Sequence, residues 1–388
     1  MTITKSTGRT VSILLVKHFT MDFKHVKFSR EANADFINTL RKRVNEYFKD
    51  NKISKFANAE MVLKTICMLG IYFVPYVLLL LNVFSSPWIM LLLWFIMGIG
   101  MSGVGTSVMH DAVHGAYSKN KFVNKIIGQS IVLLGGYYYN WELQHNVLHH
   151  SYTNIDGLDE DIDSGSLFRF SPNQEHKKHH RLQHLYCWPL YSLMTLEWST
   201  TKDFKQLLRY KRKGLLKMIN KSYSKLMGEL ILLKSLYYAV FVILPMIIID
   251  APWYITLIGV VIMHLVCGFA LAVIFQPAHV VPETEFMSTP DSGTVENNWA
   301  VHQILTTTNF APKNRILNWF IGGLNYQIEH HLFPNICHVH YRKISKIVKK
   351  TAKEFDLPYH CAKTFRRAVL NHGKMLYRLG QKDYYPVT

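Results

Sequence analysis

The sequence predicts an all-α integral membrane protein with four transmembrane helices, arranged in two hairpins beneath a cytoplasmic helical cap. Three observations predict this class. The 388-residue chain is 49% hydrophobic and yet has a formal net charge of +18. Its hydrophobic residues are concentrated in four long runs, and its basic residues lie mainly outside them. Apolar segments in lipid beside basic segments at an anionic surface explain this combination, which a single soluble domain rarely shows.

The four apolar runs come in two pairs. The first pair covers about 61–84 and 87–108, and the second covers about 231–249 and 253–275. Each run is close to the roughly 20 residues that a helix needs to cross a hydrocarbon core of about 30 Å. A buried helical hairpin of a soluble protein is the alternative, but the near absence of charge along each run argues against it. We therefore expect four membrane spans.

The distribution of basic residues predicts how the spans are oriented. Neither short connection within a pair contains Lys or Arg, whereas dense basic stretches such as 205–225 lie on the other side of the spans. The positive-inside rule places that side, with both termini, in the cytoplasm. The expected parts are a cytoplasmic N-terminal segment at 1–60 and a membrane domain at 61–388, whose cytoplasmic cap comprises 109–230 and 276–388.

Shorter features complete the predicted topology. The apolar run at 11–16 is too short for the core of a cleaved signal peptide, which also leaves the N-terminus in the cytoplasm. Lys64 and Lys234 lie near the cytoplasmic ends of their spans, where we expect them to extend towards the head groups. The apolar stretch 126–139 is short for a span, and we expect an interfacial or re-entrant helix there.

The 20 histidines are distributed unevenly around the spans. Only His264 lies inside one, where a lone histidine is expected to be a hydrogen-bonded packing residue. Others gather where a span or an apolar stretch ends. At about 100° per residue, histidines three or four positions apart share one helix face. The histidines gathered in this way are His110, His114, His145, His149, His150, His279, His330 and His331.

This pattern predicts a metal centre at the membrane surface. One pair of histidines four residues apart is weak evidence, but three groups and His279 on the same side of the spans are strong evidence. Neutral imidazole suits Fe, Zn and Cu, whereas Mg and Ca need oxygen ligands. Eight imidazoles exceed what one ion uses and suffice for two. A structural zinc site is closed by four ligands, so a ligand-rich pair beside lipid suggests chemistry on a lipid.

A further histidine-rich stretch, HKKHH at 176–180, has nearly the spacing of HNVLHH at 145–150. It lies in a polar segment and is interleaved with Lys177, Lys178 and Arg181, which would repel a metal ion. We therefore expect it to form a surface patch for head groups or an acidic partner.

The three histidine groups, HDAVH, HNVLHH and QIEHH, resemble in order and spacing the histidine boxes of the membrane fatty acid desaturases. The resemblance extends from about 55 to 350. Gln327, which opens the third group, resembles the variant found in front-end and sphingolipid desaturases. The stretch HNVLHHSYTNIDGLDEDID is similar to the bacterial linoleoyl-CoA desaturase-like group.

The resemblance implies a fatty acyl desaturase. Such an enzyme uses O₂ and electrons to insert a cis double bond into a CoA-linked or lipid-linked acyl chain at a di-iron centre, and the eight histidines match its iron ligands. Trp141 would line the acyl tunnel, with an interfacial anchor as the alternative. Residues expected either to bind iron or to hydrogen-bond to its ligands are Gln327, Asp111, Asn154, Asp156, Glu329 and His302. The acidic run after HNVLHH contains Asp156, Asp159, Glu160, Asp161 and Asp163, and a solvated loop is the alternative to hydrogen bonds with the ligand histidines. Asn154 and Asp156 are the preferred candidates for such bonds, and a simple polar contact is favoured for His302.

The electrons need a source. Many front-end desaturases carry a fused cytochrome b5 with an HPGG haem motif, but this chain contains no His-Pro dipeptide. We expect a separate ferredoxin or cytochrome b5, attracted by the basic cytoplasmic face.

Other functions fit parts of the pattern. A di-iron lipid hydroxylase uses similar boxes and would yield a hydroxyl group. A histidine-rich membrane metal transporter would need polar ligands inside the spans, which contain only His264. A zinc-dependent lipid hydrolase would need neither O₂ nor reductant. Nucleic-acid binding, the other explanation of a basic chain, is not supported by any recognised motif.

Overall fold

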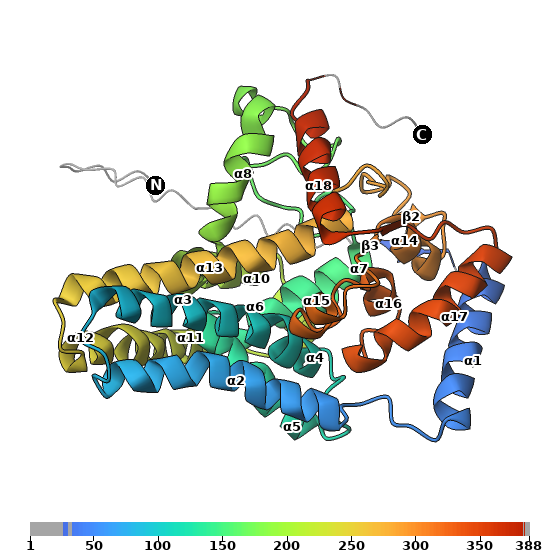
Figure 1. Ribbon diagram of the computed structural model, residues 1–388. Helices are drawn as coiled ribbons and strands as arrows, with labels where there is room; N and C mark the ends of the chain where they lie inside the picture. Colours follow the sequence, from blue (N-terminus) through green and yellow to red (C-terminus); the bar gives the residue numbers. More distant parts are fainter. Residues whose placement is uncertain (1–25, 30–32, 383, 385–388) are drawn as a thin grey trace, which may run out of the picture.

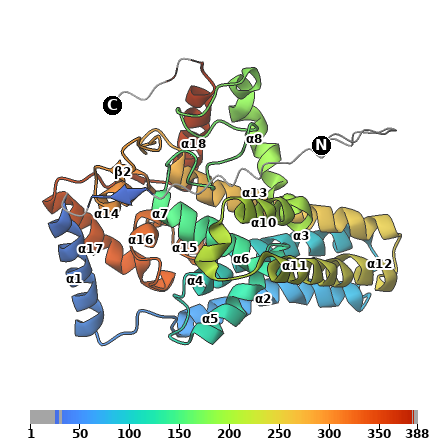
Figure 2. The same cartoon turned by 180° about the vertical axis from the view of Figure 1, so that it is seen from behind.

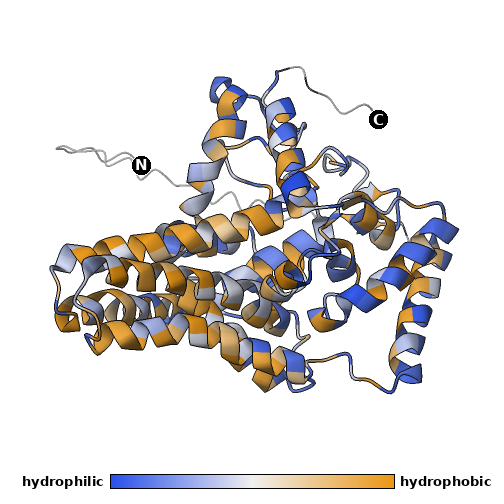
Figure 3. Cartoon of the chain, viewed as in Figure 1, coloured by the Kyte–Doolittle hydropathy of each residue, from blue (hydrophilic) through white to orange (hydrophobic). Residues whose placement is uncertain are grey.

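The computed structural model describes residues 26–29, 33–382 and 384, and this part of the chain is mostly helical. Four helices in it are long and apolar enough to cross a membrane: Ala59–Leu80, Pro87–Val113, Tyr223–Ile248 and Trp253–His279. They lie side by side in Figure 1, and Figure 3 shows that they form the most hydrophobic part of the molecule. The four apolar runs are therefore helices, as predicted. The second and fourth continue beyond their expected ends, so that they carry histidines themselves.

The long helices consist of the elements α2 (Ala59–Leu80), α3 (Pro87–Gly103), η1 (Val104–Met109), α4 (His110–Val113), α11 (Tyr223–Tyr238), η7 (Ala239–Ile243), α12 (Leu244–Ile248) and α13 (Trp253–His279). Both η1 and η7 are π-helical turns. Such turns interrupt α-helices and are frequent at functional sites. The turn η1 directly precedes His110.

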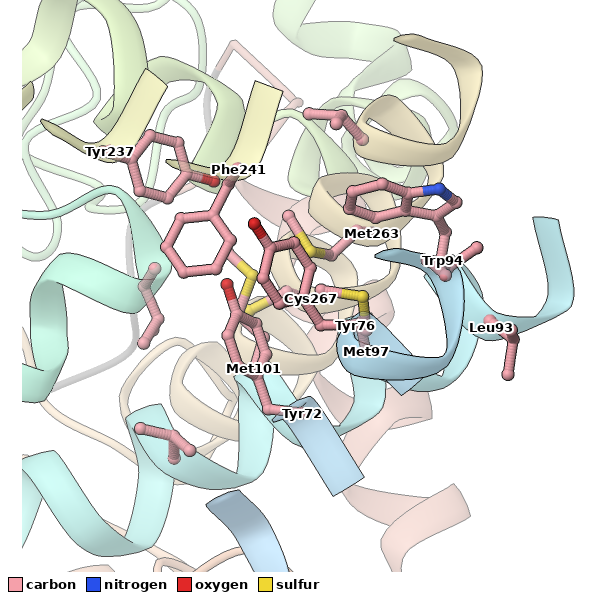
Figure 4. Packing of buried hydrophobic residues seen from close by; sticks show 14 of the residues in the cluster. Tyr72, Tyr76, Leu93, Trp94, Met97, Met101, Tyr237, Phe241, Met263 and Cys267 are labelled. Atoms are coloured by element: carbon pink, nitrogen blue, oxygen red, sulfur yellow. The ribbon is translucent and has the colours of Figure 1, made fainter. Parts of the chain in front are cut away.

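A dense core holds the long helices together. Helix α3 packs against both α2 and α13, and its Trp94 is fully buried. Figure 4 shows Trp94 among the aromatic and sulfur-containing side chains of this core. Gly259 on α13 permits the close approach, because a Cβ at that position would lie 2.1 Å from Cδ1 of Trp94. Interiors packed to this density resist any added volume.

Shorter elements build the rest of the molecule. The helices are α1 (Ala34–Asp50), α5 (Lys121–Gly128), η2 (Gln129–Leu134), α6 (Tyr138–Trp141), η3 (Glu142–His149), α7 (His150–Tyr152), η4 (Lys178–Leu182), α8 (Gln183–Ser192), α9 (Met194–Glu197), η5 (Trp198–Lys202), α10 (Asp203–Arg212), η6 (Leu215–Ile219), α14 (Trp299–Leu305), α15 (Arg315–Phe320), α16 (Gln327–Leu332), η8 (His338–His340), α17 (Tyr341–Glu354) and α18 (Phe365–Leu379). Two parallel two-stranded ladders pair β1 (Lys27–Phe28) with β2 (Thr294–Val295) and β3 (Asn309–Phe310) with β4 (Cys361–Ala362).

These elements gather at one end of the long helices. Helices α14, α16, α17 and α1 lie beyond that end, and α8 and α18 stand beside it, as both views show (Figures 1 and 2). Helix α1 packs on α17, and Arg43 forms an ion pair with Glu354 at 2.7 Å. Residues that precede the first long helix are thus part of this end of the molecule. The apolar run at 11–16 lies outside the described residues.

The stretch 126–139 does not form the single helix that we expected. It is divided among α5, the 3₁₀ helix η2 and the start of α6. The break falls at Gly135, which has φ 72°. A Cβ there would lie 2.6 Å from Cβ of Ser199, so both the backbone conformation and the space favour glycine.

The two lysines expected to reach the head groups are buried in the protein instead. Lys64 is 1% exposed, and its Nζ lies 2.6 Å from Nε2 of His338. Lys234 is 6% exposed and forms an ion pair with Asp203 at 2.6 Å. A buried ammonium is costly unless it is paired, and segments outside the long helices supply both partners. The expectation for these two side chains was therefore wrong.

His264 matches its expectation. It is buried within α13, where its Nε2 lies 2.7 Å from the hydroxyl of Tyr237 and its Nδ1 lies 3.1 Å from Oγ1 of Thr195. Both ring nitrogens are used, so this histidine is a packing residue with satisfied hydrogen bonds.

Candidate metal centre

The structure brings the eight predicted histidines together at the end of the long helices. They come from α4 and the residue after it, from η3, from the start of α7, from the last residue of α13 and from α16. Seven of them are buried, and His114 is partly buried. Rings from distant parts of the chain are neighbours: the ring centres of His110 and His330 are 4.5 Å apart, and those of His149 and His279 are 4.7 Å apart.

The possible ligand atoms form two main groups. The first comprises His110, His114, His145 and His330, and the second comprises His149, His279 and His331; within each group these atoms lie within 4.8 Å of one another. His150 lies between the groups, because it also clusters with His330 and His331. The arrangement offers two adjacent metal positions.

The chemistry of these nitrogens fits bound metal. The buried Nε2 atoms of five of these histidines have no hydrogen-bond partner among the described residues: those of His110, His114, His145, His279 and His331. Each buried polar atom without a partner costs about 1–3 kcal/mol, and metal ions would relieve the cost. Nε2 of His150 and Nε2 of His330 lie 3.0 Å apart. These two nitrogens would therefore be close enough to bind the same ion.

Partners at the second ring nitrogen orient five of the histidines. Nδ1 of His145 lies 3.1 Å from Asp161 Oδ2, and Nδ1 of His149 lies 3.0 Å from Asp159 Oδ1. Nδ1 of His279 lies 3.2 Å from the Thr306 carbonyl oxygen, and Nδ1 of His330 lies 3.2 Å from the Tyr341 hydroxyl. Nδ1 of His331 lies 2.8 Å from Gln303 Oε1. A carboxylate, carbonyl or amide oxygen at Nδ1 keeps the proton there and leaves the Nε2 lone pair for a metal.

Burial also keeps most of the cluster neutral. It lowers the pKa of His145 to about 3 and holds the pKa values of His114, His150, His330 and His331 well below the usual range. Neutral imidazole is the form that binds metal.

His149 is different. Burial lowers its pKa, but the nearby carboxylates of Asp159 and Asp161 outweigh burial and raise the pKa to about 9. A metal ion at Nε2 would replace the second proton.

The local helix type differs from the expected α-helix. His145 and His149 lie on η3, a π-helical segment, and their rings stack with centres 5.1 Å apart. The wider π-helical turn still places residues four apart near one another. His150 begins the next helix and lies with His330 and His331 on the other side of the cluster.

The candidates expected near the ligands occupy several different places. Asp111 accepts hydrogen bonds from the backbone N–H and Nδ1 of His338, at 3.0 and 2.8 Å, and its other oxygen lies 3.9 Å from Nδ1 of His110. Gln327 is 1% exposed, and its Nε2 has no partner among the described residues. Trp141 lies against His145, with ring centres 4.3 Å apart.

Other candidates make contacts away from the imidazoles. Asn154 donates to the backbone carbonyls of His279 and Glu285, each at 3.0 Å, so it holds the end of α13 by its backbone. Asp156 accepts from Ser171 Oγ at 2.8 Å and so lies apart from the ligands. His302 is hydrogen-bonded to the Thr153 carbonyl at 2.7 Å, a simple polar contact.

Glu329 is also directed away from the ligands. It accepts from Asn309 Nδ2 at 2.8 Å and from the Tyr359 hydroxyl at 2.9 Å. Burial raises its pKa to about 7.

Sequence reasoning missed three contributors, Gln303, Thr306 and Tyr341, and it preferred Asn154 and Asp156 where Asp159 and Asp161 make the contacts. The two aspartates belong to the acidic run after HNVLHH, which was a signal, but the run alone did not show which carboxylate turns back to the helix. Gln303 lies beside His302, and nothing in its sequence context distinguishes it.

HKKHH lies apart from the cluster, and none of the possible metal-binding groups in the described residues includes it. His176 is hydrogen-bonded to the Gly380 carbonyl at 2.9 Å, and His179 to the Ser166 carbonyl at 2.8 Å. These histidines therefore connect loops and the end of α18.

A cavity of about 220 Å³ reaches the histidine cluster. Its walls include His145, His149 and His279 together with the apolar side chains of Trp141 and Phe275. It adjoins a largely apolar groove of about 530 Å³, with which it shares lining residues such as Met194 and Gln276. An extended apolar chain could thus approach the imidazoles from the groove.

Comparison with known proteins identifies the family. The family model described as fatty acid desaturase matches residues 86–363. The chain belongs to the fatty acid desaturase family. An sn-1 linoleoyl-lipid 6-desaturase of Arthrospira platensis is 37% identical over 85% of this chain and 88% of the relative's length. An acyl-lipid (8-3)-desaturase of Physcomitrium patens is 36% identical over 92% of this chain and 74% of the relative's length. An sn-1 linoleoyl-lipid 6-desaturase of Synechocystis sp. is 34% identical over 92% of this chain and 98% of the relative's length.

The desaturase is thus a membrane oxidoreductase that introduces a double bond into a fatty acyl chain. Its family implies iron-dependent catalysis, which the histidine clusters fit. The hydroxylase, metal-transporter and zinc-hydrolase alternatives are not favoured by these relationships.

Proposed function

We propose that this desaturase holds two iron ions in the histidine cluster. His110, His114, His145 and His330 would hold one ion, and His149, His279 and His331 the other, with His150 placed between them. The five buried Nε2 atoms without partners are the observation that carries this assignment. When bound, the iron pair would use O₂ and two electrons to remove hydrogen from two adjacent methylenes of the acyl chain.

The protein's own groups would position the reactants. The partners at Nδ1 fix the imidazole orientations, so the ligands need little rearrangement during turnover. Trp141 and Phe275 give the cavity an apolar wall beside the histidines, where a methylene chain displaces water. Breaking an unactivated C–H bond is beyond acid–base side chains, so substrate position must decide which carbons react.

We infer an acyl-lipid substrate, desaturated between an existing double bond and the carboxyl end. Three relatives act on acyl lipids by name, and two of these on linoleoyl lipids. Gln327 at the start of the third histidine group supports the same regiochemistry by its resemblance to front-end desaturases.

We further propose that the long helices cross the membrane as two hairpins, with the histidine cluster and both termini in the cytoplasm. The connections within the pairs contain no Lys or Arg, which supports this orientation. The cap would then comprise 109–230 and 276–388, with 1–60 beside it. Electrons would come from a separate ferredoxin or cytochrome b5, attracted by the basic cytoplasmic surface.

The proposal is tested by expression in a host with simple fatty acids and a supply of linoleate. The wild-type protein is expected to yield one new cis double bond, mapped by mass spectrometry, and purified protein to contain two irons per chain. His149→Ala is expected to lower the iron content and abolish the product. Full activity and full iron content in this variant would overturn the ligand assignment.

A further inference from the structure

Lys202 is a cation in the cavity that leads to the histidines. It ends η5 (Trp198–Lys202), a π-helical turn, and lines the cavity together with His145 and His149. Its Nζ donates to Gln144 Oε1 at 2.8 Å and lies 4.5 Å from the centre of the Trp198 ring. Two π-helical segments, η3 and η5, thus border one cavity, and such segments are frequent at functional sites.

The protein leaves this ammonium incompletely paired. An ammonium group has three N–H donors, and among the described residues only Gln144 accepts from Lys202. Three neighbouring carboxylates have other partners, and one of them, Asp203, pairs with Lys234 at 2.6 Å. Asp161 Oδ1 accepts from Gln144 Nε2 at 2.6 Å, and Glu160 Oε2 accepts from Arg209 and Tyr210 at 2.8 and 2.7 Å. Two N–H donors of Lys202 therefore remain for a ligand in the cavity.

A short series of hydrogen bonds connects Lys202 with a metal-binding candidate. It runs from Lys202 to Gln144, from Gln144 to Asp161 and from Asp161 to Nδ1 of His145, with lengths of 2.8, 2.6 and 3.1 Å. Gln144 and His145 are also consecutive residues, whose Cα atoms lie about 3.8 Å apart. A group bound to Lys202 is thus held close to the reacting end of the cavity.

The side chains that line the cavity and the adjoining groove indicate which chemical group would bind to Lys202. The adjoining groove is lined by side chains such as Leu167, Phe168 and Leu193, which suit an acyl tail. Carboxylates including Asp163 and Glu197 also line the cavity, and their negative charge disfavours a phosphate or a free carboxylate. A neutral oxygen with lone pairs satisfies the ammonium without that repulsion.

We propose that Lys202 binds the ester carbonyl oxygen of the acyl lipid and thereby sets which methylene pair reaches the histidines. This inference rests on the proposed acyl-lipid substrate and adds a specificity-determining residue to it. Because Lys202 lies near the histidines, the new double bond forms near the carboxyl end of the chain. The tail occupies the apolar groove.

The first experiment measures the position of the new double bond. Wild type, Lys202→Met and Lys202→Arg are expressed with linoleate, and products are mapped by mass spectrometry. Loss of a charge-assisted hydrogen bond corresponds to roughly a ten- to hundredfold effect. Lys202→Met is expected to lower conversion by at least about tenfold and to spread the residual product over neighbouring positions, whereas Lys202→Arg keeps one position. Lys205→Met, at an exposed site nearby, is the control and is expected to match wild type.

A second experiment separates substrate binding from a structural role in holding Gln144. Purified wild type and Lys202→Met are compared for binding of methyl linoleate and of linoleyl methyl ether, which lacks the carbonyl oxygen, and for iron per chain. Wild type is expected to prefer the ester by about tenfold, and Lys202→Met to bind both equally while retaining its iron.

Three results would overturn the proposal: an unchanged product from Lys202→Met, a wild type that does not discriminate the two ligands, or a variant that retains the preference. A wild type that makes no double bond would instead contradict the proposed function. The binding comparison would still decide the role of Lys202.

Discussion

Asp159 is the buried carboxylate on which the orientation of His149 depends. Its two oxygens lie 3.0 and 3.1 Å from Nδ1 of His149, and they also accept from the backbone N–H groups of Asn154 and Asp161 at 2.8 and 2.9 Å. In Asp159→Asn one oxygen becomes an NH₂ group. In either amide orientation, one of the two backbone N–H groups then faces another donor.

The magnitude follows from these contacts. A buried N–H without an acceptor costs about 1–3 kcal/mol of folding stability. Loss of the carboxylate behind a ligand histidine lowers metal affinity by roughly 10–100-fold, which corresponds to about 1.4–2.8 kcal/mol. In the proposed di-iron centre His149 would help to hold the second ion. We expect that ion to be lost from Asp159→Asn at a chelator concentration at which wild type retains both.

The assay measures iron per chain by mass spectrometry after equilibration with graded concentrations of a chelator. Asp156→Asn is the matched control, because it makes the same substitution in the same acidic run at a carboxylate that accepts from Ser171 instead of a ligand. The reasoning is refuted if Asp159→Asn retains both irons with wild-type affinity, or if Asp156→Asn loses as much iron as Asp159→Asn.

Three further predictions follow from buried contacts. Lys64→Ala breaks a buried charged network and is expected to destabilise the protein by about 3–5 kcal/mol. The free energy of unfolding is measured by denaturant titration in detergent, and a loss below about 1 kcal/mol would contradict this prediction. Gly259→Ala is expected to lower the midpoint of thermal unfolding, because its methyl group would overlap the packed indole ring of Trp94. The expected loss of folding stability is at least about 1–3 kcal/mol. Gly70→Ala, with no atom within 4 Å of the new Cβ, should leave the midpoint unchanged. Gln303→Leu removes the acceptor from His331 Nδ1 and should reduce iron affinity by roughly 10–100-fold, while Gln303→Glu should retain most of it; equal iron contents in both variants would argue against this role.

Buried polar contacts also attach the long helices to the segments around the histidines. Lys64 on α2 contacts His338, which in turn donates to Asp111 beside His110. Lys234 on α11 pairs with Asp203 and donates to the Gly135 carbonyl. Because an unpaired buried charge is costly, these contacts favour one placement of the long helices relative to the segments that carry the clustered histidines.

The sequence by itself determined the long helices and the eight clustered histidines. Both are local properties: the length of an apolar run decides whether a helix can cross lipid, and spacing decides which residues share a helix face. The sequence predicted the ends of the helices less accurately, because a helix can continue beyond the last residue of its apolar run. The fourth run is strongly apolar only to about 275, but its helix continues to His279.

Only the tertiary structure decided which polar groups meet the histidines. Asn154 has φ 57° and is hydrogen-bonded to the end of α13 and to the Glu285 carbonyl. This turn brings Asp159 and Asp161 back to η3 and directs Asp156 to Ser171. The bonds of Asn154 join residues 125 and 131 positions apart, whereas the aspartates lie only 10–16 positions from their partners. The direction of each carboxylate depends on this long-range anchor of the turn, which no local pattern encodes. The same reason explains why Lys64 and Lys234 are buried, and why Lys202 faces the cavity.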